Sequence, residues 1–436
     1  MTDTEQIQEK IQNADTTQIF FTDLNGRVMS ITVNPENIDA ITDSGIGFDG
    51  SSIAGYATVE KSDRILFPVA ESFRNLRFSG QTVGFFIGNV FNEEGKRAMA
   101  DPRAILEKVL LQAEAEFGFR FLAGPEHEFF VLQSDVFGKD VHSDRAAYCL
   151  AAPHDRGEAV RNRIISVLGG CGIRFEKAHH EVTASQHEIN LEPADPLAAA
   201  DRTVLFNFVT QKIADELGCH ATFMPKPFDG QNRNAFHIHL SMQDRSGRNL
   251  FCDADGEHGL SPNARSFIGG ILRYARQTSI VMASTFNSYK AYVIEREAPV
   301  IRNWGFSNRS AMVRVPFCSD PEQTRIELRS PDPAGNVYLQ LAVFIAMGME
   351  GVRRGIDCGK PISGSAYSRD YGLKVWDRRF LPRSMFEALV EAERSKFLKE
   401  ILGNRIYENY MAIKVREWES HRIRVTPGEH EQYMAR

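Results

Sequence analysis

The sequence lacks the features that mark membrane, secreted and nucleic-acid-binding proteins. Its longest apolar run, Leu341–Met349, is far too short to cross a bilayer, and the first residues have no basic region followed by an apolar stretch, so no signal peptide is expected. The six cysteines are scattered without a C-x-x-C pair, which is typical of reduced thiols rather than of a disulfide framework or a zinc site. The net charge of −6 argues against nucleic acid as the main partner. We therefore expect a cytoplasmic protein that works without a membrane or nucleic acid.

The chain also lacks internal repeats and low-complexity segments. At 436 residues, 42% of them hydrophobic, it is long enough to form two or three domains with a substantial core. Information about function therefore has to come from local motifs.

What the chain does contain is a set of short predicted strands with one apolar face and one polar face. In the segment 124–130, Glu126 and Glu128 share a face because successive side chains of a strand alternate. Buried carboxylates are unfavourable unless they pair with a cation or a metal, so this segment alone is most simply an edge strand with a solvated face. The other such polar positions are His237 and His239; Arg325, Glu327 and Arg329; and Glu181 and Glu188, from a short polar connection.

Taken together, these segments indicate a single site. Five carboxylates and a histidine facing one space form a ligand set for hard cations, and we expect two or more Mg²⁺ or Mn²⁺ ions. The adjacent arginines are suited to binding phosphate. Metal ions combined with arginines favour phosphoryl transfer.

The same segments, with others in the same order, make the sequence resemble the glutamine synthetase family of ATP-dependent carboxylate–amine ligases. The resemblance covers nearly the whole chain and rests on many motifs in register. The motifs are Phe48–Ser52, Gly124–Glu128, His179–Val182, Gln186–Glu188, Met224–Pro227, His237, Asn287–Lys290, Glu297–Pro299, Asn308–Ala311, Arg325–Arg329 and Pro331–Pro333.

The resemblance implies an α+β fold with a β-grasp domain at residues 1–97 and a catalytic domain at residues 98–436, built on a curved antiparallel sheet surrounded by helices. The sequence pattern itself predicts a short helix near residues 4–14 and a hairpin over residues 18–33, whose Asn25-Gly26 pair favours a type I′ turn. Further helices are expected at 101–117, 155–168, 195–217, 264–283, 331–355 and 382–422, the last broken at Gly403-Asn404, and a short tail starts at Pro427. Strands are expected within 121–131, 173–190, 220–242 and 309–329.

The resemblance also implies roles for individual residues in ATP-dependent acyl phosphate formation. Arg309 and Arg329 would stabilise the transferred phosphoryl group, and Arg329 would also contact the acid substrate. The expected ligands of one metal are Glu128, Glu181 and Glu188, those of the second are Glu126, His237 and Glu327, and the expected nucleotide-binding residues are His239, Ser241, Arg314 and Arg325.

For the second step, the resemblance implies an ammonium pocket formed by Asp49, Tyr148, Glu181 and Glu297, with Ser52 beside Asp49. The loop that carries Asp49 would reach into a neighbouring subunit, which implies a ring-shaped homo-oligomer, dodecameric in the family. The simpler interpretations are that the segment 47–52 is a solvated turn and that Glu297 is a solvated loop charge.

The acid-binding positions depart from the family pattern. Asn232 is followed by Arg233 where the family has glycine, and Ala291 stands where the family has an arginine for the substrate α-carboxylate. Arg233 could take over the carboxylate, or it could repel an α-ammonium group and select a different acid. The default substrates are glutamate with ammonia or a small amine. A non-catalytic structural or regulatory oligomer is a further hypothesis, which the six filled metal positions disfavour.

Overall fold

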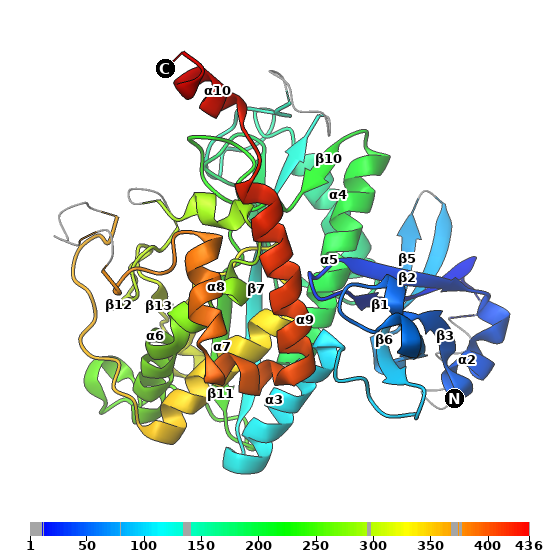
Figure 1. Cartoon of the computed structure of the whole chain (residues 1–436), viewed down its shortest axis with the longest axis horizontal. Coiled ribbons are helices and arrows are strands. Elements are labelled where there is room, and N and C mark those ends of the chain that lie inside the picture. The colour runs from blue at the N-terminus through cyan, green and yellow to red at the C-terminus, as the bar shows by residue number, and fades with distance from the viewer. Residues whose placement is uncertain are drawn as a thin grey trace.

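Figure 1 shows a computed structural model of the chain, in which a small N-terminal sheet lies beside a larger body of helices around a second sheet. The structure describes residues 11, 13–78, 80–133, 141–293, 298–367, 374 and 377–435. The expected site residue Glu297 and most of the helix expected over residues 4–14 lie outside the described residues.

The N-terminal part contains a mixed sheet and the short helix α2. Strands pair in the order β2-β1-β6-β4-β3, with β5 bonded to β6, and β1 runs parallel to β6 while the other neighbours run antiparallel. Ile19, Phe21, Leu66 and Phe86 form part of its buried apolar core. The elements are β1 (Thr16–Thr22), β2 (Val28–Val33), α2 (Ile38–Ser44), β3 (Ile46–Asp49), β4 (Asp63–Pro68), β5 (Arg74–Phe78) and β6 (Gln81–Asn92). This is the β-grasp arrangement expected from the sequence.

The β1–β2 hairpin is present, but the prediction of a type I′ turn is wrong. A type I′ turn needs two consecutive residues with positive φ, and here only Gly26 has one (84°), while Asn25 does not. The turn is a three-residue loop closed by the Gly26 N–H, which donates to the Asp23 oxygen at 3.0 Å. Its conformation is fixed by contacts with the larger body: Lys414 Nζ donates to Asn25 Oδ1 (2.9 Å) and Asn336 Nδ2 donates to the Asp23 oxygen (2.8 Å).

The larger body contains a curved sheet in the order β12-β13-β14-β11-β7-β9-β8, with β10 bonded to β7. All neighbouring pairs are antiparallel except β12 and β13. Its strands are β7 (Arg120–Leu132), β8 (Phe175–His180), β9 (Gln186–Leu191), β10 (His220–Thr222), β11 (Ile238–Gln243), β12 (Trp304–Phe306), β13 (Val313–Val315) and β14 (Ile326–Leu328). One face packs on the core, where Phe129, Ile189 and Leu240 are buried, so the polar side chains of the same strands share the other face.

The helices form largely where the sequence predicts them. Asp101 caps α3 and accepts from the Arg103 N–H, with Pro102 at the first helical position, and Gly403 with a φ of 74° interrupts α9. The helices are α3 (Pro102–Phe117), α4 (Glu158–Gly170), α5 (Pro196–Glu216), α6 (Pro262–Met282), α7 (Val337–Arg354), α8 (Met385–Glu393), α9 (Lys396–Arg422) and α10 (Pro427–Tyr433). Figure 1 shows α4 and α5 on the side of the body that faces the N-terminal sheet. Over the described ranges, no helix has both the length and the apolar character of a membrane span.

Candidate functional site

One group of acidic side chains comes from β7, β9 and the end of β8. Glu128 lies opposite Glu188 in the β7–β9 register, and His179 lies opposite Glu188 in the β8–β9 register. Potential ligand atoms of His179, Glu181 and Glu188 lie within 4.8 Å of one another. Burial, and then the charges of Glu181 and Glu188, raise the pKa of Glu128 well above its ordinary value. A divalent cation between these carboxylates would relieve that repulsion, so the group fits a metal.

A second group comes from β7, β14 and the residues at the start of β11. His237 Nδ1 lies 3.0 Å from Glu126 Oε2 and 3.7 Å from Glu327 Oε1. His239 Nε2 lies 3.1 Å from Glu126 Oε1. Burial acts to raise the pKa of Glu126, but the hydrogen bonds from the two imidazoles hold it well below its ordinary value. These carboxylate and imidazole donors also suit a divalent metal.

Two arginines flank the buried carboxylate of Glu327. Arg314 NH1 lies 2.7 Å from Glu327 Oε2, and Arg329 NH1 is bonded to Glu327 Oε1. Burial favours the neutral carboxyl, but Arg329 and the nearby imidazoles lower the pKa of Glu327 to about 2. The guanidiniums are thus held beside the carboxylate groups, where they can also bind a phosphate.

The residues expected to bind the nucleotide line one cavity of about 490 Å³. His239, Ser241, Arg314 and Arg325 all contribute to its wall, together with Glu126 of the second acidic group. Arg325 Nε lies 3.3 Å from His239 Nδ1, so the arginine and the imidazole lie side by side. A volume of this size suits a small-molecule ligand.

Three residues at this site were missed by the sequence reasoning. His179 lies 3.6 Å from both Glu181 and Glu188, and Lys177 Nζ lies 3.7 Å from Glu126 Oε1 and from Glu188 Oε1. Strand alternation could have found both, because they lie two residues apart on β8. The third is Phe317, which lines the cavity of about 490 Å³ with 81% of its surface exposed. No local pattern marked this aromatic residue.

The expected acid-binding residue Arg233 is buried rather than open to solvent. Its guanidinium donates to the main-chain oxygens of Arg329 (2.5 Å) and Ser330 (3.2 Å) and lies over the ring of Tyr292. Tyr292 is the next residue after Ala291, which is also buried. Asn232 is only half-buried. The Arg233 side chain therefore extends to Tyr292, next to position 291, where the family pattern has an arginine and this chain has Ala291.

The residues expected at the ammonium pocket are not all brought together within one chain. Asp49 accepts from the Ser52 hydroxyl at 2.6 Å and from the Ser51 N–H at 2.8 Å, and these bonds lower its pKa. It is exposed at the end of β3, which Figure 1 places in the outer part of the N-terminal sheet, away from β7. Tyr148, in contrast, lies beside the first acidic group, with its ring 5.0 Å from that of His179.

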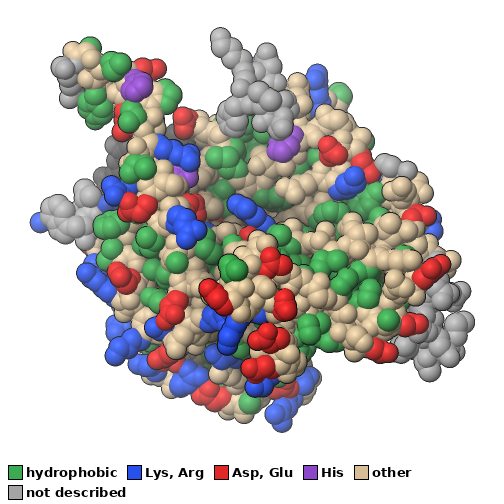
Figure 2. All heavy atoms as spheres, turned by 45° about the vertical axis from the view of Figure 1, so that its right-hand side comes forward, with side chains coloured by type: hydrophobic (Ala, Val, Ile, Leu, Met, Phe, Trp, Pro, Cys, Tyr) green, Lys and Arg blue, Asp and Glu red, His purple; other side chains and the backbone are tan. Residues whose placement is uncertain are grey.

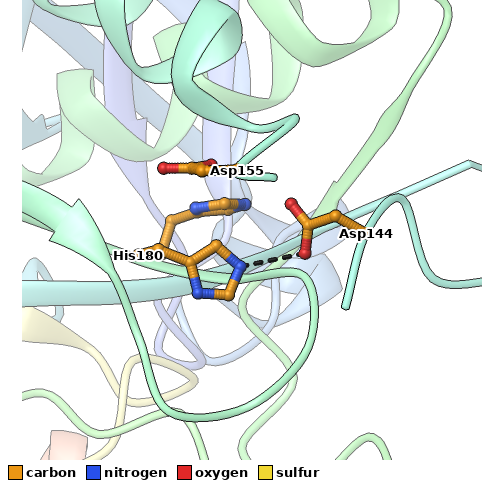
Figure 3. Close-up of side chains that lie close together, drawn as sticks. Asp144, Asp155 and His180 are labelled. Carbon is orange, nitrogen blue, oxygen red and sulfur yellow. Dashed lines mark hydrogen bonds and ion pairs between the residues drawn. The ribbon is translucent and has the colours of Figure 1, made fainter. Parts of the chain in front are cut away.

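A buried polar network adjoins the first acidic group, and the sequence did not predict it. Figure 3 shows three of its members, Asp144, Asp155 and His180. His180 Nε2 lies 2.9 Å from Asp144 Oδ1, and His180 Nδ1 lies 2.6 Å from the main-chain oxygen of Glu181. Both imidazole nitrogens thus face acceptors, and although burial lowers the pKa of His180, these bonds raise it above its ordinary value. A protonated His180 therefore ties the backbone of Glu181 to a buried carboxylate.

His187 directly precedes Glu188 in the chain, as His180 precedes Glu181, and it belongs to the same buried network. Its Nδ1 accepts from Arg161 NH1 at 2.8 Å, and Arg161 pairs with Asp155 at 2.6 Å. Burial, followed by the charge of Arg161, lowers the pKa of His187 to about 3, so this imidazole is neutral. Four potential ligands, Asp144, Asp155, His180 and His187, meet here. Because a guanidinium and an imidazolium already balance the carboxylates, we interpret this network as a support for the site rather than as a metal centre.

Comparisons with known proteins agree with this geometry. A family model described as the glutamine synthetase catalytic domain matches residues 99–433, and one described as the glutamine synthetase beta-grasp domain matches residues 13–93. Similar curated proteins include the glutamine synthetase of Methanococcus maripaludis, 37% identical over 98% of this chain and 97% of the relative. The glutamine synthetase of Thermotoga maritima is 35% identical over 97% of each chain.

Solved structures show the same fold. A GmaS chain in complex with ADP is 30% identical and aligns over 100% of both chains with a TM-score of 0.90. A Plasmodium falciparum glutamine synthetase structure is 22% identical, covers 99% of both chains and has a TM-score of 0.87. The second likeness concerns the fold alone.

Proposed function

The chain belongs to the glutamine synthetase family and is therefore an ATP-dependent ligase, and on this premise we propose that it joins glutamate to ammonia or a small amine through an acyl phosphate. The observation that carries the proposal is the position of Glu327. It is paired with Arg329 and with Arg314, which lines the nucleotide cavity, and it lies 3.7 Å from His237 of the second acidic group. A structural relative was solved in complex with ADP, which supports a nucleotide as a substrate of this chain.

Members of this family use divalent metals, and the two acidic groups fit such ions. The carboxylates of Glu181 and Glu188 lie close enough to Glu128 to raise its pKa, which favours a cation between them, and carboxylate with imidazole suits Mg²⁺ or Mn²⁺. Bound there, the ions would supply positive charge against the phosphates of ATP. The proposed ligands are Glu128, Glu181 and Glu188 for one ion and Glu126, His237 and Glu327 for the other.

In the first step, a carboxylate oxygen of the acid attacks the terminal phosphorus of ATP. The bond from that phosphorus to the bridging oxygen breaks, ADP leaves and an acyl phosphate forms. Arg309 and Arg329 would stabilise charge on the transferred group, and Arg314 would hold the phosphates. Ser241, His239 and Arg325 would hold the remainder of the nucleotide in the cavity.

In the second step, the amine attacks the acyl carbon and inorganic phosphate leaves. Ammonium must first lose a proton, which a carboxylate can accept. Asp49, Glu181 and Glu297, with Tyr148 and Ser52, are the residues we propose for this pocket. Because Asp49 lies in the N-terminal sheet away from β7, the pocket would need β3 of a second subunit. We therefore propose a homo-oligomer with active sites between subunits, a dodecameric ring by analogy with the family.

For the acid, we propose that Arg233 replaces the arginine missing at position 291. Its guanidinium is already ordered by two main-chain oxygens and the ring of Tyr292, so little conformational entropy is lost when a carboxylate binds. The second candidate is the same chemistry on an acid without an α-ammonium group. The observation that favours it is the burial of the Arg233 cation where an ammonium group would have to dock.

The test is ATP-dependent phosphate release with Mg²⁺ across a matrix of acids and amines. The acids are glutamate, aspartate and dicarboxylates without an amine, and the nucleophiles are ammonium, methylamine, ethanolamine and a diamine. We expect turnover with glutamate and ammonium or a small amine. Turnover only with an acid that lacks the α-amine supports the second candidate. Absence of turnover together with failure to bind Mn²⁺ in a titration would instead favour a non-catalytic oligomer.

A further inference from the structure

A second cavity, of about 420 Å³, lies between the N-terminal sheet and α5. None of the described site residues lines it. One wall is apolar and is formed by Phe85 and Ile87 of β6 and by Leu197 and Leu205 of α5. The volume and the partly apolar lining are typical of sites for small organic molecules.

Part of the charge around this cavity is already balanced. Arg103 forms a bidentate pair with Asp201, with Nε and NH2 each 3.0 Å from a carboxylate oxygen, and its NH1 lies 2.5 Å from Glu107. Tyr338 donates to the same Asp201 carboxylate at 2.8 Å. Asp195 is exposed and caps α5 by accepting from the Leu197 N–H. Each of these charged groups therefore already has a partner within the protein and does not need a ligand.

Arg74 and Arg202 are different, because within the described part of the chain neither forms an ion pair, although the exposed carboxylates of Glu71 and Asp195 line the same cavity. Among the described residues, Arg202 makes no hydrogen bond or ion pair, and Arg74 donates only to the main-chain oxygens of Glu71 (3.0 Å) and Phe73 (2.6 Å). Burial lowers the pKa of Arg202 and the charge of Arg74 lowers it further, while the nearby carboxylate of Glu192 offsets only part of this effect. Two like charges that are partly withdrawn from water repel each other, and an anion bound between them would compensate that repulsion.

We propose that this cavity binds a small organic anion. Its carboxylate or phosphate group would pair with Arg74 and Arg202, because guanidiniums bind both groups in a bidentate manner. Its apolar part would lie against Phe85 and Ile87. Acidic and basic side chains are interspersed over the face shown in Figure 2, so the attraction is a property of this pair of arginines and not of a generally basic surface.

The cavity also has a direct connection to the active site. Arg202 on α5 is followed by Thr203, whose hydroxyl lies 3.0 Å from His127 Nε2. His127 is buried on β7 between Glu126 and Glu128, the proposed ligands of the two metals. An anion bound to Arg202 therefore lies one residue away from the side chain that packs behind both carboxylates, a position from which it can act as an effector.

The test is isothermal titration calorimetry of the full chain with phenyl phosphate, phenylacetate and inorganic phosphate, with ADP and Mn²⁺ present at saturation so that they compete for the nucleotide cavity. The variants are Arg202→Met and Arg74→Met. The matched control is Arg77→Met, because Arg77 is exposed on β5 and its side chain points to the opposite face from that of Arg74. Ala198→Leu narrows the cavity without removing a charge.

We expect at least one aromatic probe to bind the parent protein more tightly than inorganic phosphate does. Affinity should fall about tenfold or more in Arg202→Met and Arg74→Met, fall in Ala198→Leu, and stay unchanged in Arg77→Met. Binding of phenyl phosphate alone assigns a phosphate ligand, and binding of phenylacetate alone assigns a carboxylate. The proposal is overturned if neither aromatic probe binds, or if both arginine variants bind as tightly as the parent protein. Arg314 lines the nucleotide cavity and not this one, so Arg314→Met should leave the affinity for the aromatic probes unchanged. This variant therefore separates the anion site from the proposed ligase activity.

Discussion

Arg314 and Glu327 face each other across β13 and β14, with Arg314 NH1 2.7 Å from Glu327 Oε2. Arg329 binds the other carboxylate oxygen, so one fully buried anion orients two cations. The carboxylate stays ionised because these cations compensate its buried charge, and losing either partner would leave a buried charge uncompensated. The pairing places two guanidiniums beside the proposed metal ligands before any substrate arrives.

The first prediction concerns the carboxylate of Glu327. Glu327→Gln should weaken Mn²⁺ binding at one of two sites by at least about tenfold and lower the free energy of unfolding by about 3–5 kcal/mol, because Arg329 would be buried without its partner. A Mn²⁺ titration and urea denaturation measure the two effects. The control is Glu116→Gln, which removes an exposed carboxylate that pairs with Arg353. Unchanged Mn²⁺ binding would show that Glu327 is not a ligand.

The second prediction concerns the support behind Glu181. Asp144→Asn removes the negative charge that faces His180, so the imidazole should lose its proton and its bond to the Glu181 oxygen should weaken. We expect Mn²⁺ affinity and turnover to fall about 10–100-fold in a protein that remains folded. The pH profile of turnover should also shift between parent and variant, an effect that a merely structural change would not produce. Equal Mn²⁺ affinity in the two proteins would remove the positioning role.

The third prediction is steric. A Cβ atom at Gly157 would lie 2.2 Å from Cε1 and Nε2 of the buried His187 ring. Gly157→Ala should therefore force the imidazole away from Arg161 and destabilise the protein by about 1–3 kcal/mol. Gly169→Ala is the control, because it lies in α4 with open space around it and should stabilise by about 0.5–1 kcal/mol. Urea denaturation of both variants distinguishes the clash from a general effect of alanine.

The sequence could predict the acidic site because its residues occupy regular strands. Glu126 and Glu128 share a face through simple alternation, and the same rule places His237 and His239 together. The β7–β9 register that sets Glu128 opposite Glu188 depends on long-range pairing, which a single sequence does not reveal.

The remaining features depend on tertiary contacts that have no local signal. The turn at Asn25-Gly26 follows an ordinary hairpin rule in sequence, but Lys414, distant in the chain, binds Asn25 and fixes another loop type. The direction of Arg233 is likewise set by the main-chain oxygens of Arg329 and Ser330. Asn25 and Arg233 were both singled out in the sequence, but the residues that bind them could not be identified from the sequence.

The fourth prediction is a pH dependence of stability. Burial raises the pKa of Asp332 to about 6, from an ordinary value near 3.8. The folded protein thus holds this proton more tightly than the unfolded chain, so the contribution of Asp332 to stability is greatest below pH 3.8 and is lost as the pH rises through about 6. Asp332→Asn should gain up to about 3 kcal/mol relative to the parent protein at pH 8, and little at pH 4. Urea denaturation at both pH values checks this, and an equal difference at both would contradict it.

The last prediction tests how the acid is recognised. If Arg233 binds the carboxylate of glutamate, Arg233→Gly alone should raise the KM for glutamate at least tenfold. Adding Ala291→Arg should restore it, because the second guanidinium enters beside Tyr292 from the neighbouring position. The KM for ATP should stay unchanged in both variants, which makes it the internal control. If the double variant instead gains glutamate activity that the parent protein lacks, Arg233 excludes glutamate, and the natural acid is one without an α-ammonium group.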